Sequence, residues 1–212
     1  MNKKSLVVIS AGLRQPSSTR LLADQLATSV AAIAKGRDSS IDIKNLELRD
    51  TAHEVVNNLL VGYPSPSLEK VIETVTQADG LIVASPVFAA SVSGMFKSFF
   101  DILDKDALVG KPVLLAATGG TARHALVLEQ VIRPIFTYLR AATVTTAVYA
   151  APEDWGGATA GGVLSDRIDR AARELAQAME MSVPRNADAA AEQTTPFDLL
   201  LAAGSRDAHL PA

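Results

Sequence analysis

The chain contains no cysteine among its 212 residues, and this absence excludes disulfides, thiolate metal sites and a cysteine nucleophile. Only three histidines occur, His53, His124 and His209, and their positions give no two-ligand spacing for zinc. Long apolar runs are missing too, since no segment approaches the roughly 20 residues that a membrane-spanning helix needs. We therefore expect neither a metal centre nor a membrane span.

An excess of positive charge is also lacking. The net charge is −3, and lysine and arginine are dispersed rather than gathered in a basic stripe, which makes nucleic acid a poor candidate partner. The amino end, "MNKKSLVV", leads directly into a strand pattern without a separate signal region, so we expect a cytoplasmic protein. Small molecules are the better candidate ligands.

What the sequence does contain is an alternation of short apolar runs with longer helical patterns. The expected strands are Ser5 to Ser10, Ile41 to Leu48, Gly80 to Ser85, Pro112 to Thr118 and Thr143 to Ala150. The expected helices are about Ser18 to Lys35, Ser67 to Ala78, Gly94 to Leu103, Arg123 to Leu139 and Ser165 to Met181. The first, third and fourth strands are continuously apolar, as strands buried on both faces of a parallel sheet must be. The pattern predicts an α/β fold with a doubly wound, five-stranded parallel sheet of order 2-1-3-4-5 and helices on both faces.

One domain is expected over residues 1–184, because a chain of this length can bury one large core and hardly two. Residues 185–212 are expected to form a linker and a carboxyl-terminal tail. The polar, alanine-rich "NADAAAEQTT" is typical of a linker. The following "PFDLLLAAG" is too apolar to stay free in water, so we expect it to dock on the domain or on a neighbouring subunit.

The first candidate site is the loop after the first strand, because ligands of such sheets bind beyond the carboxyl ends of the strands. The loop carries small, hydroxyl-bearing or cationic residues, namely Ser10, Gly12, Arg14, Ser17, Ser18 and Thr19. Hydroxyls, free N–H groups at a helix amino end and a guanidinium suit a terminal phosphate. Neither the P-loop motif nor the dinucleotide glycine motif is present, which favours a monophosphate over a pyrophosphate. The alternative is plain helix capping by Ser17 or Ser18.

The second candidate is the loop after the third strand. Pro86 redirects the chain there, so backbone groups of Val87 and Phe88 are expected to point outward and to meet the edge of a flat heterocycle. The helix that follows carries an apolar face made by Met95, Phe96, Phe99, Phe100 and Leu103. That face is more apolar than one side of one sheet requires, and we expect it to mark a subunit interface, with burial in the core as the alternative.

The third candidate is "ATGGTARH", after the fourth strand. Gly119 and Gly120 permit positive φ and a close approach of backbone to ligand, and Thr118 and Thr121 add hydroxyls. The alternative is a turn that merely needs glycine. His124 has two open interpretations, contact with a ligand or a capping or interface role.

Three motifs together resemble the NAD(P)H-dependent FMN reductases of flavodoxin-like fold. These motifs are "S-x-G-L-R-Q-P-S-S-T", "SPVFAASVSGMFKSFFDILD" and "ATGGTARHALVLEQVIRPIFTYLRA". Within the family, the chain is most similar to the reductases that supply reduced flavin to two-component monooxygenases of the sulfonate-utilisation type and to luciferase-like monooxygenases. The similarity covers about Ser5 to Ala151.

The resemblance implies a site, a reaction and partners. The FMN phosphate would be held by Ser10, Arg14, Ser17, Ser18 and Thr19, the isoalloxazine edge by Pro86, Val87 and Phe88, and its opposite side by Thr118, Gly119 and Gly120. Hydride would pass from NAD(P)H to FMN with no side-chain acid or base assigned, in a homodimer or homotetramer that serves a partner monooxygenase. The alternatives are an FMN-containing quinone, azo-dye or metal-ion reductase and a non-enzymatic, flavodoxin-like electron carrier.

Two positions depart from the family pattern. Phe88 stands where the family often has tyrosine, and Gln130 stands where sulfonate-linked relatives have an aromatic residue. These departures leave open whether FMN is a substrate or a resident cofactor. The sequence also leaves the choice between NADPH and NADH open.

Overall fold

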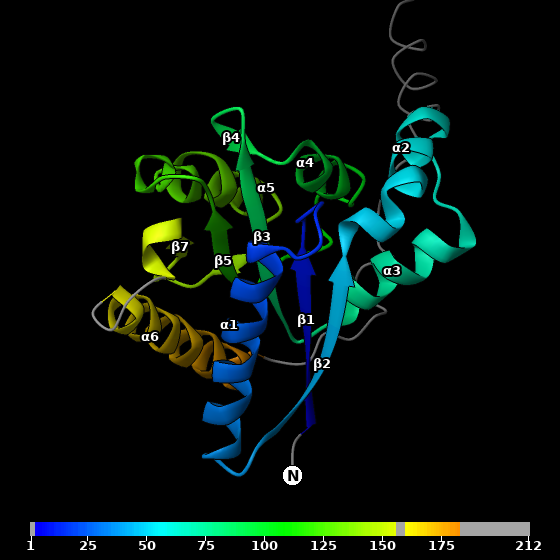
Figure 1. Cartoon of the computed structure of the whole chain (residues 1–212). Coiled ribbons are helices and arrows are strands. Elements are labelled where there is room, and N and C mark those ends of the chain that lie inside the picture. The colour runs from blue at the N-terminus through cyan, green and yellow to red at the C-terminus, as the bar shows by residue number, and fades with distance from the viewer. Residues whose placement is uncertain (1–2, 156–159, 183–212) are drawn as a thin grey trace, which may run out of the picture.

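A central, mainly parallel sheet organises the computed structural model, which describes residues 3–155 and 160–182 (Figure 1). Its strands are β1 (Lys3–Ser10), β2 (Ser40–Glu47), β3 (Gly80–Phe88), β4 (Ser91–Val92), β5 (Pro112–Thr118), β6 (Ala142–Thr143) and β7 (Val148–Ala150). The order is β2-β1-β3-β5-β6, while β7 also pairs with β5 and the short β4 pairs antiparallel with β3. The predicted order 2-1-3-4-5 is confirmed, with the predicted fifth strand present as two pieces, β6 and β7.

Side-chain hydrogen bonds to the backbone accompany the break between β6 and β7. Between β6 and β7, Glu174 accepts hydrogen bonds from the backbone N–H and the hydroxyl of Thr146, at 2.7 and 2.6 Å. Arg133 donates to the carbonyls of Val144 and Thr145, at 3.1 and 3.3 Å. Side chains therefore take up polar backbone groups that a continuous strand would have paired with β5.

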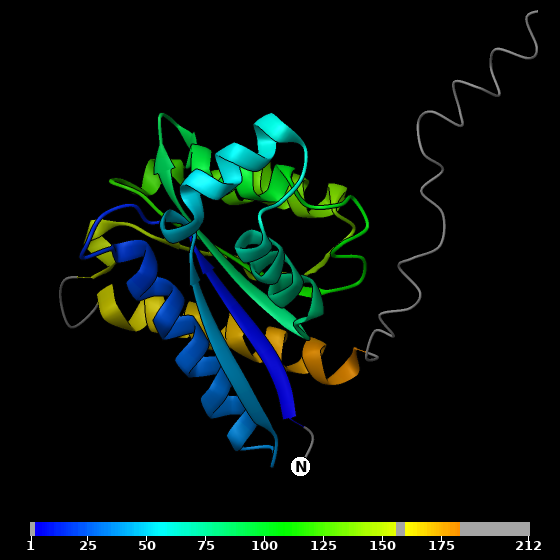
Figure 2. The same ribbon diagram turned by 90° about the vertical axis from the view of Figure 1, so that its right-hand side faces the viewer.

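Helices cover both faces of this sheet, as Figures 1 and 2 show. The α-helices are α1 (Ser18–Lys35), α2 (Ala52–Val61), α3 (Pro66–Gln77), α4 (Gly94–Asp101), α5 (Arg133–Tyr138) and α6 (Ala160–Met181). Shorter turns are η1 (Leu48–Thr51), η2 (Ala122–His124), η4 (Pro152–Asp154) and the π-helical η3 (Leu128–Ile132). One apolar core lies under α1 and α6, and a second lies under α2 to α5. None of the helices within the described ranges is both long and apolar enough to cross a bilayer.

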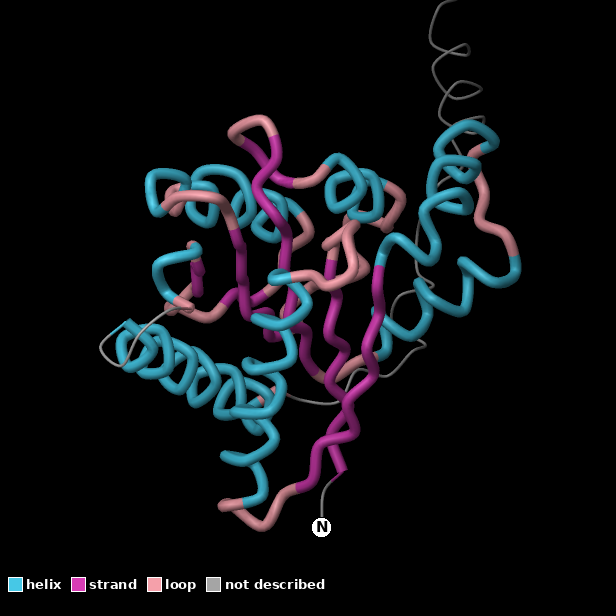
Figure 3. Tube along the Cα trace, viewed as in Figure 1, coloured by secondary structure: helices cyan, strands magenta, loops and turns pink. Residues whose placement is uncertain are grey.

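Several predicted boundaries are confirmed and others are wrong. Helix α1 occupies the predicted range, because the Ser17 hydroxyl caps it by accepting from the N–H of Arg20 at 3.2 Å. The helix predicted from Arg123 to Leu139 is three pieces, η2, η3 and α5. The segment predicted as a loop at Pro86 to Phe88 continues β3, which then turns back through β4. Helix α2 was not predicted (Figure 3).

The apolar face predicted on α4 is not exposed. Phe96, Phe99, Phe100 and Leu103 are all buried within the chain itself. Phe96 and Phe100 also pack on Phe136 of α5, with ring centroids 6.3 and 4.8 Å apart. The expectation that this face marks a subunit interface is therefore wrong, because α5 and the sheet already bury it.

The predicted linker and tail, residues 185–212, lie outside the described residues. The division into a domain over 1–184 and a tail over 185–212 stays a prediction.

Candidate functional site

The three candidate loops meet at one edge of the sheet. Strand β3 lies between β1 and β5, with Ser10 opposite Ala84 and Pro86 opposite Thr118. All three strands are parallel, so their carboxyl ends lie together at the upper edge of the sheet in Figure 1. The structure thus brings the three predicted segments side by side.

The first loop ends at the amino end of α1. The hydroxyl oxygen of Ser17 accepts a hydrogen bond from the N–H of Arg20. The N–H groups of Ser18 and Thr19, in contrast, have no hydrogen-bond acceptor within the described residues. Arg14 is exposed and pairs with no other described residue. Gly12 is buried, and a Cβ there would overlap the hydroxyl of Ser17. Free N–H groups, a free guanidinium and a closely folded backbone make this loop suitable for an anion.

Beneath this loop lies a buried hydroxyl without a partner. Ser10 is 2% exposed, and its Oγ forms no hydrogen bond. Side chains alternate along β1, so Ser10 faces the same side as Val8 and Leu6, which pack under α1. A buried hydroxyl that forms no hydrogen bond is costly, and an acceptor bound at the amino end of α1 would satisfy it.

Thr19 and Thr118 join the first and third loops directly. Their hydroxyls share a 2.7 Å hydrogen bond, and both residues are buried. Only one of the two protons is used in that bond, so the other hydroxyl proton stays free for an acceptor. The sequence placed both threonines near a ligand but did not predict their contact, because they are 99 residues apart.

Charged residues at and just after the end of β2 contact the first loop and the start of α1, and the sequence analysis did not identify them. Glu47 accepts from Arg20 at 3.0 Å and from Arg49 at 2.7 Å. When the side-chain amide of Gln15 is turned so that its oxygen faces the guanidinium of Arg49, this oxygen accepts a hydrogen bond from Nη1 at 2.8 Å. The signal was the pair of charges "E-L-R" at the end of the second strand, which lies beside β1 in the confirmed order.

The second segment is a hairpin rather than a loop. Val87 pairs with Val92 and Phe88 with Ser91. Ser85 closes the base of the hairpin, accepting from the N–H of Ser93 at 3.1 Å. Pro86 is buried, while Phe88 is 46% exposed at the tip. The segment therefore ends in a hairpin with a half-exposed aromatic ring at its tip, and not in a loop of outward-facing backbone.

The hairpin turn itself is strained. Ala89 and Ala90 have φ of 46° and 62°, a region that costs an L-residue with a Cβ roughly 1–2 kcal/mol. Two-residue hairpin turns favour Asn-Gly for this reason.

The third loop differs from prediction in its backbone. Neither Gly119 nor Gly120 has a positive φ, so the expectation that they serve that purpose is wrong. A Cβ on Gly119 would overlap the phenol oxygen of Tyr149, whereas one on Gly120 would meet no atom within 4 Å. The N–H of Gly119 donates to the carbonyl of Ala150 at 3.2 Å, and that of Gly120 has no acceptor within the described residues. Within the described residues, the N–H of Gly120 is therefore a free backbone donor of this loop, as is the N–H of Thr121.

Tyr149 of β7 is the titratable group with a perturbed pKa in this region. Burial raises its pKa above the usual 10.0, and the negative charges of Glu153 and Asp154 raise it further. Asp154 is held by the N–H of Ala151 at 2.8 Å and by Arg167 at 3.0 Å. The phenol therefore stays protonated at neutral pH and acts as a donor.

Two other features bear on the site. His124 lies in η2, half-buried, and its ring has no hydrogen-bond or ion-pair partner in the described part of the chain. No cluster of three or more potential metal ligands occurs within residues 3–155 and 160–182.

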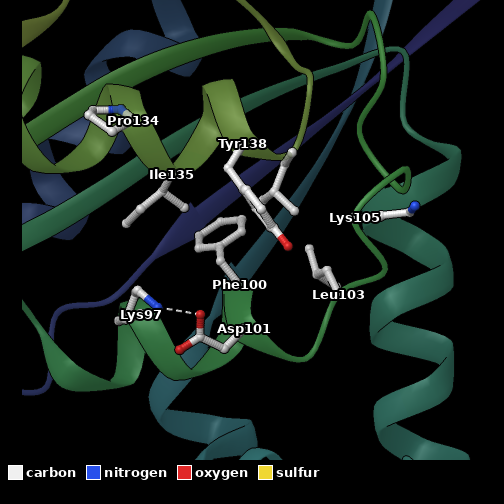
Figure 4. A pocket seen from close by; sticks show the side chains of 9 residues that line it. Lys97, Phe100, Asp101, Leu103, Lys105, Pro134, Ile135 and Tyr138 are labelled. Carbon is white, nitrogen blue, oxygen red and sulfur yellow. Dashed lines mark hydrogen bonds and ion pairs between the residues drawn. The ribbon is translucent and has the colours of Figure 1, made fainter.

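A separate cavity of about 510 Å³ lies between the carboxyl ends of α4 and α5 (Figure 4). Phe100, Ile135 and Tyr138 are among its lining residues, and none of the twelve predicted site residues lines it. The predicted site therefore lies apart from this cavity.

Comparison with known proteins agrees with this geometry. The family model described as NADPH-dependent FMN reductase matches residues 5–156. The FMN reductase (NADPH) of Pseudomonas aeruginosa is 39% identical over 71% of this chain and 78% of its own length. The NADH-dependent FMN reductase SfnF of Pseudomonas putida is 37% identical over 70% of this chain and 77% of its own length.

A solved structure extends the likeness to three dimensions. An oxidoreductase from Corynebacterium diphtheriae superposes with a TM-score of 0.83 at 43% identity, covering 86% of this chain and all of that one. The region matched by the family model, residues 5–156, contains the three segments at the sheet edge.

Proposed function

The chain belongs to the NADPH-dependent FMN reductase family, and from this membership we propose that it is an NAD(P)H-dependent FMN reductase. It transfers a hydride from reduced nicotinamide to FMN. One observation carries the assignment to this edge of the sheet: an anion-binding helix end with an unpartnered buried hydroxyl, Ser10 Oγ, lies beside a glycine loop with a free N–H. This combination fits a molecule with a phosphate at one end and a flat ring at the other.

The phosphate end is assigned to the first loop. The free N–H groups of Ser18 and Thr19 and the helix dipole of α1 favour an anion, and the guanidinium of Arg14 adds charge. Ser10 supplies a hydroxyl from below. Ser17 caps the helix as well as bordering the loop, so capping and phosphate binding coexist.

The ring end is assigned to the hairpin and the third loop. The bound flavin supplies the hydride acceptor, so the chain itself needs to orient two rings and to stabilise developing negative charge. In this proposal, Phe88 and Val87 at the end of β3 border one edge of the ring, and the N–H of Gly120, which has no acceptor within the described residues, donates to the ring from the end of β5. No side-chain acid or base takes part in this proposal, because a preorganised backbone donor stabilises an anion without proton transfer.

The proposal extends to a cytoplasmic setting, to reduced FMN released as a product, and to a partner monooxygenase that consumes it. It also extends to a homodimer or homotetramer. Support for an oligomer comes from α2 and its end, where Val56, Leu59, Leu60 and Tyr63 are exposed at helical spacing. In light scattering, Leu60→Lys should reduce the oligomer size, while Leu126→Lys, at an exposed position on another segment, should not. A monomeric wild type would contradict the oligomer proposal.

The decisive experiment mixes the protein with NADPH or NADH and graded FMN and follows oxidation of the nicotinamide. The proposal expects a rate that saturates with added FMN. Turnover of a quinone without added FMN would favour a resident-FMN reductase instead. Flavin binding without oxidation of either nicotinamide would indicate an electron carrier.

A further inference from the structure

The loop from Gly119 to Ala122 depends on β7 and η4 for its position. The carbonyl of Ala150 accepts from the N–H of Gly119 at 3.2 Å, and Glu153 accepts from the N–H of Ala122 at 3.3 Å. Between them, the phenol of Tyr149 donates to the carbonyl of Thr121 at 2.7 Å. All three tethers come from one short stretch of chain outside the three predicted loops.

Of the two side chains among these tethers, that of Tyr149 is buried, whereas Glu153 is exposed. Tyr149 is 4% exposed and lies opposite Ala117, directly beside the end of β5. A Cβ on Gly119 would overlap its hydroxyl oxygen, lie 3.2 Å from its Cζ and lie 3.4 Å from Cβ of Val87. The phenol therefore packs against the backbone of Gly119, on the side where a side chain of that residue would lie.

This packing gives Gly119, but not Gly120, a structural reason for lacking a side chain. Position 119 is glycine because the phenol of Tyr149 occupies the space of a side chain. A Cβ at position 120 would meet no atom within 4 Å, so the protein leaves room for a side chain there. The structural role of the first glycine leaves the ligand-facing role to the second.

We propose that Tyr149 is a positioning residue of the flavin site. Hydrogen-bonded to the carbonyl of Thr121 and packed against Gly119, its phenol fixes the position of the third loop and of the N–H of Gly120. The inference rests on the proposed function and adds to it a residue from β7, a strand that borders the site without belonging to its three loops.

The first test compares Tyr149→Phe with Tyr138→Phe, which alters an exposed tyrosine on α5. FMN and riboflavin are titrated into each variant, and the change of flavin fluorescence is followed. Loss of one neutral hydrogen bond at the ring end predicts about threefold to tenfold weaker binding of both flavins in Tyr149→Phe. Tyr138→Phe should bind both as the wild type does. A lower melting temperature with unchanged flavin affinities would show a merely structural role and overturn the proposal.

The second test uses Gly119→Ala alone and combined with Tyr149→Phe. The added methyl overlaps the phenol oxygen in the first variant, but that oxygen is absent in the second, where the nearest ring carbon is 3.2 Å away. The double variant should therefore bind riboflavin more tightly than Gly119→Ala alone. Additive losses would overturn the proposal.

These readouts separate the inference from the proposed function. A wild type that binds flavins but oxidises neither NADPH nor NADH would refute the reductase assignment, and the titrations would still decide the role of Tyr149. A wild type that binds neither flavin would refute both.

Discussion

At the residue scale, Arg14 tests the assignment of the phosphate end. Arg14 is exposed and has no hydrogen-bond or ion-pair partner among the described residues, so its removal breaks no hydrogen bond or ion pair there. Arg14→Ala should weaken FMN binding by about 1.5–3 kcal/mol, the value of a charge-assisted hydrogen bond, and leave riboflavin binding nearly unchanged. Parallel titrations with the two flavins measure this. Equal losses for both would refute the phosphate contact.

Gly120 tests the ring end at the same scale. Because a Cβ there would meet no atom within 4 Å, Gly120→Val should leave the circular dichroism spectrum and the melting temperature unchanged. The branched side chain would enter the space of the ligand and cost flavin binding about 1–3 kcal/mol. Gly36→Ala, at the end of α1, is the matched control, with ordinary contacts of 3.4 Å or more. Retained flavin-dependent NAD(P)H oxidation in Gly120→Val would show that the third loop is only a turn.

At the element scale, the strained hairpin between β3 and β4 offers a stability test. Ala90→Gly places a residue without a Cβ at φ 62° and should raise the free energy of unfolding by roughly 1 kcal/mol. Ala32→Gly, in the exposed interior of α1, should lower it by about 1 kcal/mol. Urea denaturation of the three proteins measures both changes. A destabilised Ala90→Gly would mean that the turn is not strained.

The same elements show how much the sequence could predict. Strand β5 and helix α1 lie where predicted, because a continuous apolar run and a serine cap are local signals. The hairpin was missed because its turn is Ala-Ala, which lacks the asparagine or glycine that marks such turns. The threonine pair and the Gly119–Tyr149 contact depend on segments that meet only after folding, so no local pattern contains them.

The sequence predictions of two helical segments failed, each for a different physical reason. Helix α2 leaves Val56 and Leu60 exposed, so its apolar residues do not form the single buried stripe that identifies a helix on a sheet. The segment from Arg123 to Leu139 has helical spacing, but it includes the π-helical turn η3, which contains Gln130. A π-turn inserts one residue and changes which side chains face the core after it, and such turns occur often at functional sites. Hydrophobic spacing cannot locate that insertion.

At the scale of the whole molecule, Asp79 links strands at the edge of the sheet where they begin, opposite the edge that carries the candidate site. It accepts from the backbone N–H of Ser5 at 2.7 Å and pairs with Lys4 at 3.4 Å, joining β1 to the start of β3. Lys4 also donates to the carbonyl of Ser182, just after α6. Burial acts to raise the pKa of Asp79, but the hydrogen bonds from Ser5 and the charge of Lys4 outweigh it and lower the pKa below 3.8.

This lowered pKa predicts how stability depends on pH. A carboxyl whose pKa is depressed by folding stabilises the protein above the unfolded value of 3.8, and loses that contribution as the pH falls through the folded value. Asp79→Asn should therefore be less stable than the wild type at pH 7, with the gap narrowing below about pH 4. Urea denaturation across this range measures the gap. A gap that is independent of pH would contradict the assignment.

The position of Asp79 has a consequence for how this protein can change. Its ion pair and hydrogen bonds lie where the strands begin, whereas the loops that we assign to flavin lie where they end. Random mutagenesis confined to the starting edge should alter thermal tolerance and leave kinetic constants alone, and mutagenesis of the opposite edge should do the reverse. Directed evolution could thus first accumulate stabilising substitutions at the edge where the strands begin. The added stability would then offset the destabilising substitutions that a change of electron acceptor requires at the other edge.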